Sequence, residues 1–248
     1  MPTALIVEDE PQANELLAML VQLRGYRTES ALTGVQALEL AARGRPDIVF
    51  LDLMLPDQTG YDVCRALRSA QGTAATPVVM VTARLEAENR EQGFRVGATD
   101  YIPKPYTPDQ IFGAIDRADA WSRRLASVAL EGSIPLDARP GASSLPEVSR
   151  LAGLILARTP TPEEKVGGPG RALVELALRA EAWGSRRGKG LVATLAYRCD
   201  ADRSVVTLRD ESGWFQDEPP LDPDGPLARG GFREMDYDPA EGRLALKL

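Results

Sequence analysis

The sequence predicts an α/β protein: a doubly wound sheet of five parallel strands over residues 1–124, followed by an α+β sandwich over residues 125–248. Three observations predict this architecture. In the first half, short β-branched apolar runs alternate with stretches of helical periodicity, which is typical of parallel strands joined by helices. Polar residues end several of these runs. Near residue 125, proline and glycine interrupt the pattern, which indicates a domain boundary.

The strands of the first domain are predicted from apolar runs that are too short for helices and rich in β-branched residues. We expect strands over residues 4–7, 26–30, 48–51, 78–81 and 100–103. Apolar residues recur at helical spacing in the intervening stretches, and a last helix begins near Thr107. Five strands and five helices in alternation form a doubly wound sheet.

The second domain is predicted to open with a stretch that cannot be one regular element, because it is punctuated by Gly132, Pro135, Pro140, Gly141 and Pro146. After this stretch we expect, in order, a helix over 148–156, a break at 167–170, a helix over 171–183, strands over 191–197 and 204–209, a proline- and glycine-rich stretch over 216–231 and a strand over 243–248.

The composition excludes several classes of protein. With 44% hydrophobic and 26% charged residues, the 248-residue chain can bury a core and is unlike a disordered protein. No apolar run approaches the roughly 18–20 residues that cross a bilayer, and Glu8 ends the first run too early for a signal peptide. We therefore expect a soluble, cytoplasmic protein with no membrane partner. The net charge of −7 has the wrong sign for a chain that chiefly grips DNA.

The sequence contains no histidine. This absence excludes Ser-His-Asp and Cys-His catalysis, histidine-bound metals and a histidine that carries a phosphoryl group. The two cysteines, Cys64 and Cys199, lie far apart and form no metal-binding motif. Any acid, base or phosphate chemistry must use carboxylates, lysine, hydroxyls or a bound hard cation.

Polar residues end four of the predicted strands: Glu8 and Asp9 the first, Asp52 the third, Thr82 the fourth and Lys104 the fifth. Because the carboxyl ends of parallel strands share the edge where ligands bind, we expect these side chains to converge. Clustered carboxylates repel one another unless a cation lies among them, and an oxygen-rich site suits Mg²⁺ or another divalent cation. Asp52 can then act as a nucleophile toward phosphorus. A single aspartate at a strand end is more often a turn or cap residue, but the complete set favours function.

Several motifs of the first half carry a family resemblance. They are residues 7–10, residues 47–56 with Gly60 following, residues 81–83 and residues 97–105. Together they resemble the receiver domain of two-component response regulators, over about residues 1–124. The resemblance implies a flavodoxin-like fold that accepts a phosphoryl group, with a histidine kinase or a phosphotransferase as the phosphodonor.

The resemblance also implies roles for individual residues. Asp52 would be the phosphoacceptor, and the metal would be held by Glu8, Asp9, Asp52 and the backbone carbonyl of Met54. These are the acidic residues that the strand-end argument selects, with one carbonyl added.

Three further roles follow from the same resemblance. Thr82 and Lys104 would bind the phosphoryl oxygens, and Tyr101 would be the aromatic switch residue that turns inward when Thr82 moves toward phosphate. The peptide bond between Lys104 and Pro105 would be cis.

The order of motifs in the second half resembles the ATP-binding domain of anti-sigma-factor serine kinases, of the superfamily shared with histidine kinases and gyrase. The motifs are residues 130–135, 144–148, 175–182, 208–215 and 237–242. Several features depart from the family pattern. Ser185 stands where the family has a magnesium-binding asparagine, Trp214 stands in the glycine-rich adenine loop, and the second glycine-rich loop is cut down to residues 228–233. Asp210 and Gly213 are the remaining candidates for nucleotide contact, although this stretch alone is more typical of a turn.

We interpret the chain as a response regulator whose kinase-like output domain binds protein without turning over ATP, so that the chain is not itself expected to be an enzyme. A sigma-factor or anti-sigma pathway component is the expected output partner, and a homodimer is compatible with this interpretation. Two alternatives stay open: an active ATP-dependent serine kinase controlled by the receiver, and a DNA-binding transcription regulator. DNA binding is disfavoured because residues 125–248 carry 16 Lys and Arg against 19 Asp and Glu.

Overall fold

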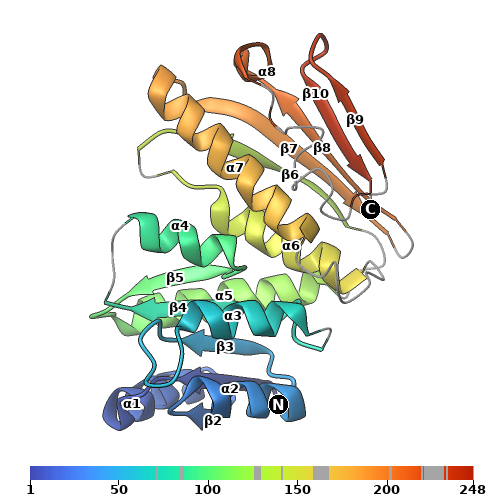
Figure 1. Cartoon of the computed structure of the whole chain (residues 1–248). Helices are drawn as coiled ribbons and strands as arrows, with labels where there is room; N and C mark the ends of the chain where they lie inside the picture. The colour runs from blue at the N-terminus through green and yellow to red at the C-terminus, as the bar shows by residue number, and fades with distance from the viewer. Residues whose placement is uncertain are drawn as a thin grey trace. The chain divides into compact units, whose positions relative to one another are not determined.

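The computed structural model describes residues 1–70, 72–83, 87–125, 130–140, 142–158, 168–200, 203–218, 220, 232 and 234–247. The chain divides into two compact units, Met1–Arg124 and Leu125–Leu248. Each unit has its own five-stranded sheet (Figure 1). No helix within the described ranges is both long enough and apolar enough to span a bilayer.

The sheet of the first unit is parallel throughout, and its strand order is β2-β1-β3-β4-β5. Its strands are β1 (Thr3–Val7), β2 (Arg27–Ala31), β3 (Ile48–Leu51), β4 (Val78–Thr82) and β5 (Asp100–Pro103). This is the order of a flavodoxin-like doubly wound sheet. The predicted five-stranded parallel sheet is confirmed, and its strands lie within one or two residues of the predicted ranges.

Helices cover both faces of this sheet. They are α1 (Pro11–Gln22), α2 (Gly34–Gly44), α3 (Gly60–Ser69), α4 (Ala87–Arg95) and α5 (Pro108–Leu125). Successive strand residues point to opposite faces, so Ile6 packs with α1 and α5 while Leu5 and Val7 pack with α2 and α3. The strands are therefore buried on both sides, which explains their uninterrupted apolar sequences.

The second unit has an antiparallel sheet with the strand order β6-β7-β8-β10-β9. Its strands are β6 (Leu130–Asp137), β7 (Leu191–Cys199), β8 (Ser204–Asp210), β9 (Glu234–Asp238) and β10 (Arg243–Lys247), and its helices are α6 (Leu145–Arg158), α7 (Gly168–Arg187) and α8 (Trp214–Asp217). Helix α7 lies across one face of the sheet against β6 and β7, with α6 packed beside it (Figure 1). The arrangement is α+β.

The stretch that opens the second unit is not one regular element, as predicted, but its first part was missed as a strand, because residues 130–137 form β6. Strand β6 lies at the edge of the sheet, where a proline such as Pro135 can be accommodated without its missing N–H breaking the ladder. Gly132 lies opposite Tyr197, and a Cβ atom at position 132 would stand 2.6 Å from the Tyr197 hydroxyl. Gly132 and Pro135 therefore both fit the strand.

Two other expectations for the second unit need correction. The expected break at 167–170 is mostly the first turn of α7, which begins at Gly168 and tolerates Pro169 because first-turn N–H groups have no helical partner. Strand β9 was not predicted. Its acidic sequence disfavours a strand, but β9 is an edge strand, and charge is common at sheet edges. Most of the stretch 216–231 lies outside the described residues, as do residues 228–231 and 233 of the shortened loop.

Candidate functional site

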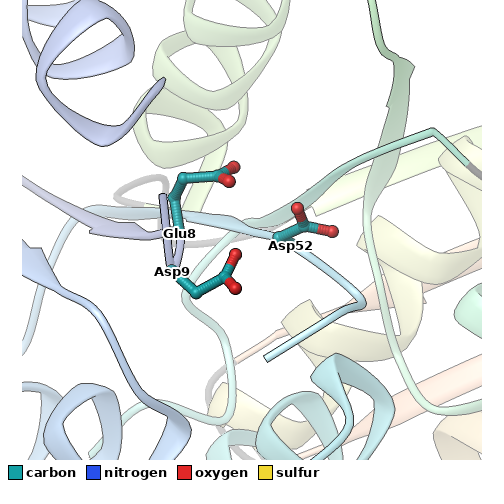
Figure 2. A group of neighbouring side chains, drawn as sticks. All are labelled: Glu8, Asp9 and Asp52. Carbon is teal, nitrogen blue, oxygen red and sulfur yellow. The ribbon is translucent and has the colours of Figure 1, made fainter. Parts of the chain in front are cut away.

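The carboxyl ends of the parallel strands bring three acidic side chains together. Glu8 and Asp9 follow β1 directly, and Asp52 follows the neighbouring strand β3. One carboxylate oxygen from each of the three lies within 4.8 Å of the others. The side chains of Glu8 and Asp9 extend toward the side on which Asp52 lies (Figure 2). The predicted convergence of these carboxylates is therefore present in the structure.

The three carboxylates differ in their surroundings. Glu8 and Asp52 are buried, with 4% and 6% of their surfaces exposed, whereas Asp9 is open to solvent. Burial raises the pKa of Glu8, and the nearby charges of Asp52 and Asp9 act in the same direction, while Lys104 opposes the shift. Two buried carboxylates and an exposed one form an oxygen-rich pocket that strongly favours a cation.

Lys104 follows β5 and reaches into this pocket. Its Nζ donates hydrogen bonds to Oε2 of Glu8 and to Oδ2 of Asp52. Burial alone would lower the pKa of Lys104, but the hydrogen bonds and the charges of the two carboxylates outweigh it and raise the pKa. The ammonium group therefore stays protonated beside the carboxylates. The Lys104–Pro105 peptide bond is cis, as expected.

The loop between β3 and α3 is folded tightly against Asp52. The amide of Met54 donates to Oδ1 of Asp52 at 3.1 Å, and the amide of Gly60 donates to the carbonyl of Leu53 at 3.0 Å. A Cβ atom at Gly60 would lie 2.2 Å from the backbone oxygen of Asp52, so only glycine fits there. Met54 and Thr59 form an isolated antiparallel bridge across the loop. The backbone that carries Asp52 is thereby held in place.

Thr82 and Tyr101 lie on the two strands beside this pocket. Thr82 is the last residue of β4 and is fully buried, and its carbonyl accepts a hydrogen bond from the amide of Lys104 at 2.8 Å. Tyr101 is half-buried on β5, next in register to Met80, and packs against the cluster formed with α2 and α3. Both residues thus occupy the strand positions that the sequence predicts.

Asn14 is a supporting residue of the site that the sequence analysis missed. Its side chain is buried in α1 and its Nδ2 donates to the carbonyls of Glu8 at 3.1 Å and Ala31 at 3.2 Å. It therefore ties the turn that carries Glu8 to the end of β2. Its position on the apolar face of α1, together with Leu17 and Val21, was the available signal, because a polar residue there must find buried partners.

The second-unit candidates lie in a turn after β8. The carboxylate of Asp210 accepts hydrogen bonds from the amides of Ser212, Gly213 and Phe215 at 2.9, 3.0 and 2.9 Å, which uses both of its oxygens. Gly213 has a φ of +88°, in the left-handed region that favours glycine. Trp214 is completely buried. Asp210 and Gly213 therefore shape the backbone of this turn.

The first-unit pocket fits a magnesium ion by the chemistry of its donors. Glu8, Asp9 and Asp52 supply carboxylate oxygens, which Mg²⁺ prefers, and the exposure of Asp9 leaves room for the water molecules that this ion retains. Among the described residues, Lys104 forms ion pairs with both buried carboxylates.

Comparison with known proteins gives consistent matches to response regulators. Residues 4–116 match the family model described as the response regulator receiver domain. The chain is 36% identical over 115 residues to the DNA-binding dual master transcriptional regulator RpaA of Synechocystis, covering 46% of this chain and 48% of RpaA. It is 31% identical over 229 residues to the response regulator MprA of Mycobacterium leprae, covering 87% of this chain and 99% of MprA.

Solved structures match about half of the chain. The chemotaxis response regulator CheY4 of Vibrio cholerae is 30% identical, with a TM-score of 0.46, over 48% of this chain and 98% of that protein. The match to RpaA spans about half the length of RpaA, whereas the match to MprA spans nearly the whole length of MprA.

Proposed function

This chain belongs to the response regulators of two-component systems, and from that membership we propose that it accepts a phosphoryl group on Asp52 in a Mg²⁺-dependent reaction. This proposal depends chiefly on one arrangement: Lys104 donates hydrogen bonds to both Asp52 and Glu8, and Asp9 lies beside these carboxylates. The donor is a histidine kinase or a phosphotransferase. The chain has no histidine, so it would accept a phosphoryl group without donating one from a phosphohistidine of its own.

The chemistry follows from the charges in the pocket. A carboxylate oxygen of Asp52 attacks phosphorus, the bond from phosphorus to the donor breaks, and the electron pair leaves with the donor. Glu8, Asp9, Asp52 and the Met54 carbonyl would hold Mg²⁺, which neutralises charge on the phosphoryl oxygens when bound. Lys104, already bonded to Asp52, would contact a phosphoryl oxygen as the acyl phosphate forms.

The signal would leave the pocket through the neighbouring strands. We assign to the buried hydroxyl of Thr82 a contact with the phosphoryl group, and to Tyr101 a turn toward the space that Thr82 vacates. Such a change shifts the equilibrium between two arrangements of the surface formed by β5 and its flanking helices, because the phosphoryl group binds one arrangement better than the other.

For the second unit we propose a protein-binding output domain that does not turn over ATP. This proposal rests on the kinase-like resemblance of its motifs, while the surroundings of three of its residues disfavour nucleotide chemistry. The carboxylate of Asp210 accepts hydrogen bonds from backbone amides, and Trp214 is completely buried. The hydroxyl of Ser185 donates a hydrogen bond to the carbonyl of Ala138 at 3.3 Å. A component of a sigma-factor or anti-sigma pathway is the partner that this resemblance favours, with a second copy of the chain as a further partner.

DNA binding is the second candidate output, because RpaA is described as DNA-binding and KdpE of Mycobacterium tuberculosis as a transcriptional regulatory protein. Those matches cover 46% and 48% of this chain. Arginines at the end of α7 are engaged locally, since Arg186 pairs with Glu218 and Arg187 with Asp217. Together with the acidic balance of residues 125–248, these pairs favour a protein partner over DNA.

Phosphate acceptance is tested by incubating the full chain with Mg²⁺ and acetyl phosphate and separating phosphorylated from unmodified protein on a phosphate-affinity gel. We expect a hydroxylamine-sensitive phosphorylated species in the wild type, none in Asp52→Asn, and none when EDTA removes the metal. Equal phosphorylation of Asp52→Asn and wild type would refute the assignment of the acceptor.

The output is tested by calorimetric titration of the full chain with ATP and Mg²⁺, and by a gel shift with duplex DNA at several salt concentrations. We expect no heat of ATP binding at millimolar nucleotide and no salt-dependent shift. Mg²⁺-dependent ATP binding would instead support an active kinase, and a shift that weakens steeply with salt would support DNA binding.

A further inference from the structure

Asp57 makes a contact that the proposed chemistry does not use. It lies in the exposed loop between β3 and α3, five residues after Asp52, and its side chain reaches to another element. Its Oδ1 accepts a hydrogen bond from the amide of Gly34 and its Oδ2 one from the amide of Val35, both at 2.8 Å. These amides belong to the first turn of α2. One carboxylate therefore joins the loop that follows the acceptor to the start of a helix.

The contact suits its location electrostatically. First-turn amides of a helix have no helical partner and carry the positive end of the helix dipole, so a carboxylate is the preferred acceptor. The next amide, that of Gln36, is bound by the side chain of Thr33 at 3.2 Å. Helix α2 thus has two separate caps, one local from Thr33 and one from the β3–α3 loop. The pKa of Asp57 is lowered by the bonds from Gly34 and Val35, which agrees with a carboxylate held in its charged form.

The loop has contacts besides that of Asp57. At its base, the amide of Gly60 binds the carbonyl of Leu53, and Met54 bridges to Thr59. Between them, Leu55 packs against the apolar cluster formed with α2 and α3, and the side chain of Gln58 lies against Gly34. Pro56 and Asp57 are exposed, so burial contributes little to fixing these two residues. The two hydrogen bonds of Asp57 are the charged contact between this part of the loop and α2. Without it, the loop has more conformations to lose whenever a ligand orders it.

We propose that Asp57 is a positioning residue for the metal site: by binding the first turn of α2, it holds the β3–α3 loop, and with it the Met54 carbonyl, in the conformation that takes Mg²⁺. This inference rests on the proposed function, because Met54 is a metal ligand only in that proposal. Asp57 itself does not touch the metal or the phosphoryl group. Without Asp57, part of the free energy of Mg²⁺ binding is used to order the loop. The affinity for Mg²⁺ is then weaker although the oxygen ligands are the same.

The test is a calorimetric titration of the full, unphosphorylated chain with Mg²⁺. Asp57→Ala is expected to raise the Kd for Mg²⁺ by about three- to tenfold. This change corresponds to part or all of the free energy by which a capping residue usually stabilises a helix. Asp57→Asn, which keeps one acceptor oxygen, is expected to give an intermediate Kd. Thr33→Ala is the matched control, because it removes the other cap of the same helix without touching the loop, and its Kd should equal that of the wild type.

A second readout separates positioning from simple stabilisation. In acetyl phosphate reactions, Asp57→Ala should need more Mg²⁺ for half-maximal phosphorylation but reach the wild-type rate at saturating Mg²⁺. If Asp57→Ala binds Mg²⁺ as tightly as Thr33→Ala and wild type, Asp57 is only a helix cap and the inference is overturned. The metal titration judges it even if Asp52 takes no phosphate, a result that would sink the proposed function alone. Absence of Mg²⁺ binding by the wild type would overturn both.

Discussion

Lys104→Met should lower the rate of Asp52 phosphorylation by about 10²-fold or more, the usual effect of removing one donor that stabilises developing negative charge. The ammonium group of Lys104 is bonded to both buried carboxylates, and methionine replaces its bulk without its charge. The rate is measured with acetyl phosphate at saturating Mg²⁺. Lys189→Met is the matched control, because Lys189 is an exposed lysine of the second unit, and its rate should equal that of the wild type.

The same variant should bind Mg²⁺ at least as tightly as the wild type. Lys104 and the metal compete for the oxygens of Glu8 and Asp52, so removing the ammonium group frees those oxygens. Without metal, two buried carboxylates are left facing one another, and the variant should unfold more easily until Mg²⁺ is added. A wild-type phosphorylation rate in Lys104→Met would contradict the role given to this residue.

Gly60→Ala should destabilise the first unit by about 1–3 kcal/mol, the range for overpacked sites, and should also slow phosphorylation. The new Cβ atom would lie 2.2 Å from the backbone oxygen of Asp52 and 2.8 Å from the Cα of Leu53. Both are backbone atoms that cannot move aside as a side chain would, so the strand end that carries the acceptor must shift. Chemical denaturation measures the free energy of unfolding, and the acetyl phosphate reaction measures the rate.

Gly113→Ala is the control for Gly60→Ala. Gly113 lies inside α5, and the nearest atom to its added Cβ is a terminal nitrogen of Arg117 at 3.1 Å, which belongs to a flexible side chain. Alanine is favoured over glycine inside a helix by about 1 kcal/mol, so this variant should be as stable as the wild type or more stable. If Gly60→Ala behaved like Gly113→Ala, the tight packing of the loop against Asp52 would be wrong.

The fold and the acidic pocket of the first unit could be predicted because their signals are local. Buried parallel strands read as short apolar runs, and the residue after each strand lies at one edge of the sheet whatever the loops do. Glu8, Asp9 and Asp52 could therefore be grouped without coordinates. The hydrogen-bond partners of the residues that support the pocket could not be predicted. Asn14 binds backbone carbonyls and Asp57 binds backbone amides of other elements. Nearly every residue carries these backbone groups, so the sequence does not show which of them a side chain binds.

The second unit was harder to predict for a different physical reason. The two missed strands, β6 and β9, are both at sheet edges. An edge strand has a neighbouring strand on one side only, so residues with low β-propensity are tolerated there. Gly132 and Pro135 in β6, and the acidic residues of β9, are tolerated there and would not be tolerated in β7 or β8. The central strands β7 and β8 carry strong apolar patterns, and both were predicted within two residues.

The central claim is that Asp52 carries the phosphoryl group, and the most direct measurement of it is chemical trapping. The wild-type chain is treated with Mg²⁺ and acetyl phosphate, reduced with borohydride, digested and sequenced by mass spectrometry. Reduction converts an aspartyl phosphate to homoserine, so we expect homoserine at position 52 and at no other aspartate. Homoserine at Asp9 or at another position, or its absence from the peptide that contains residue 52, would contradict the assignment of Asp52 as the acceptor.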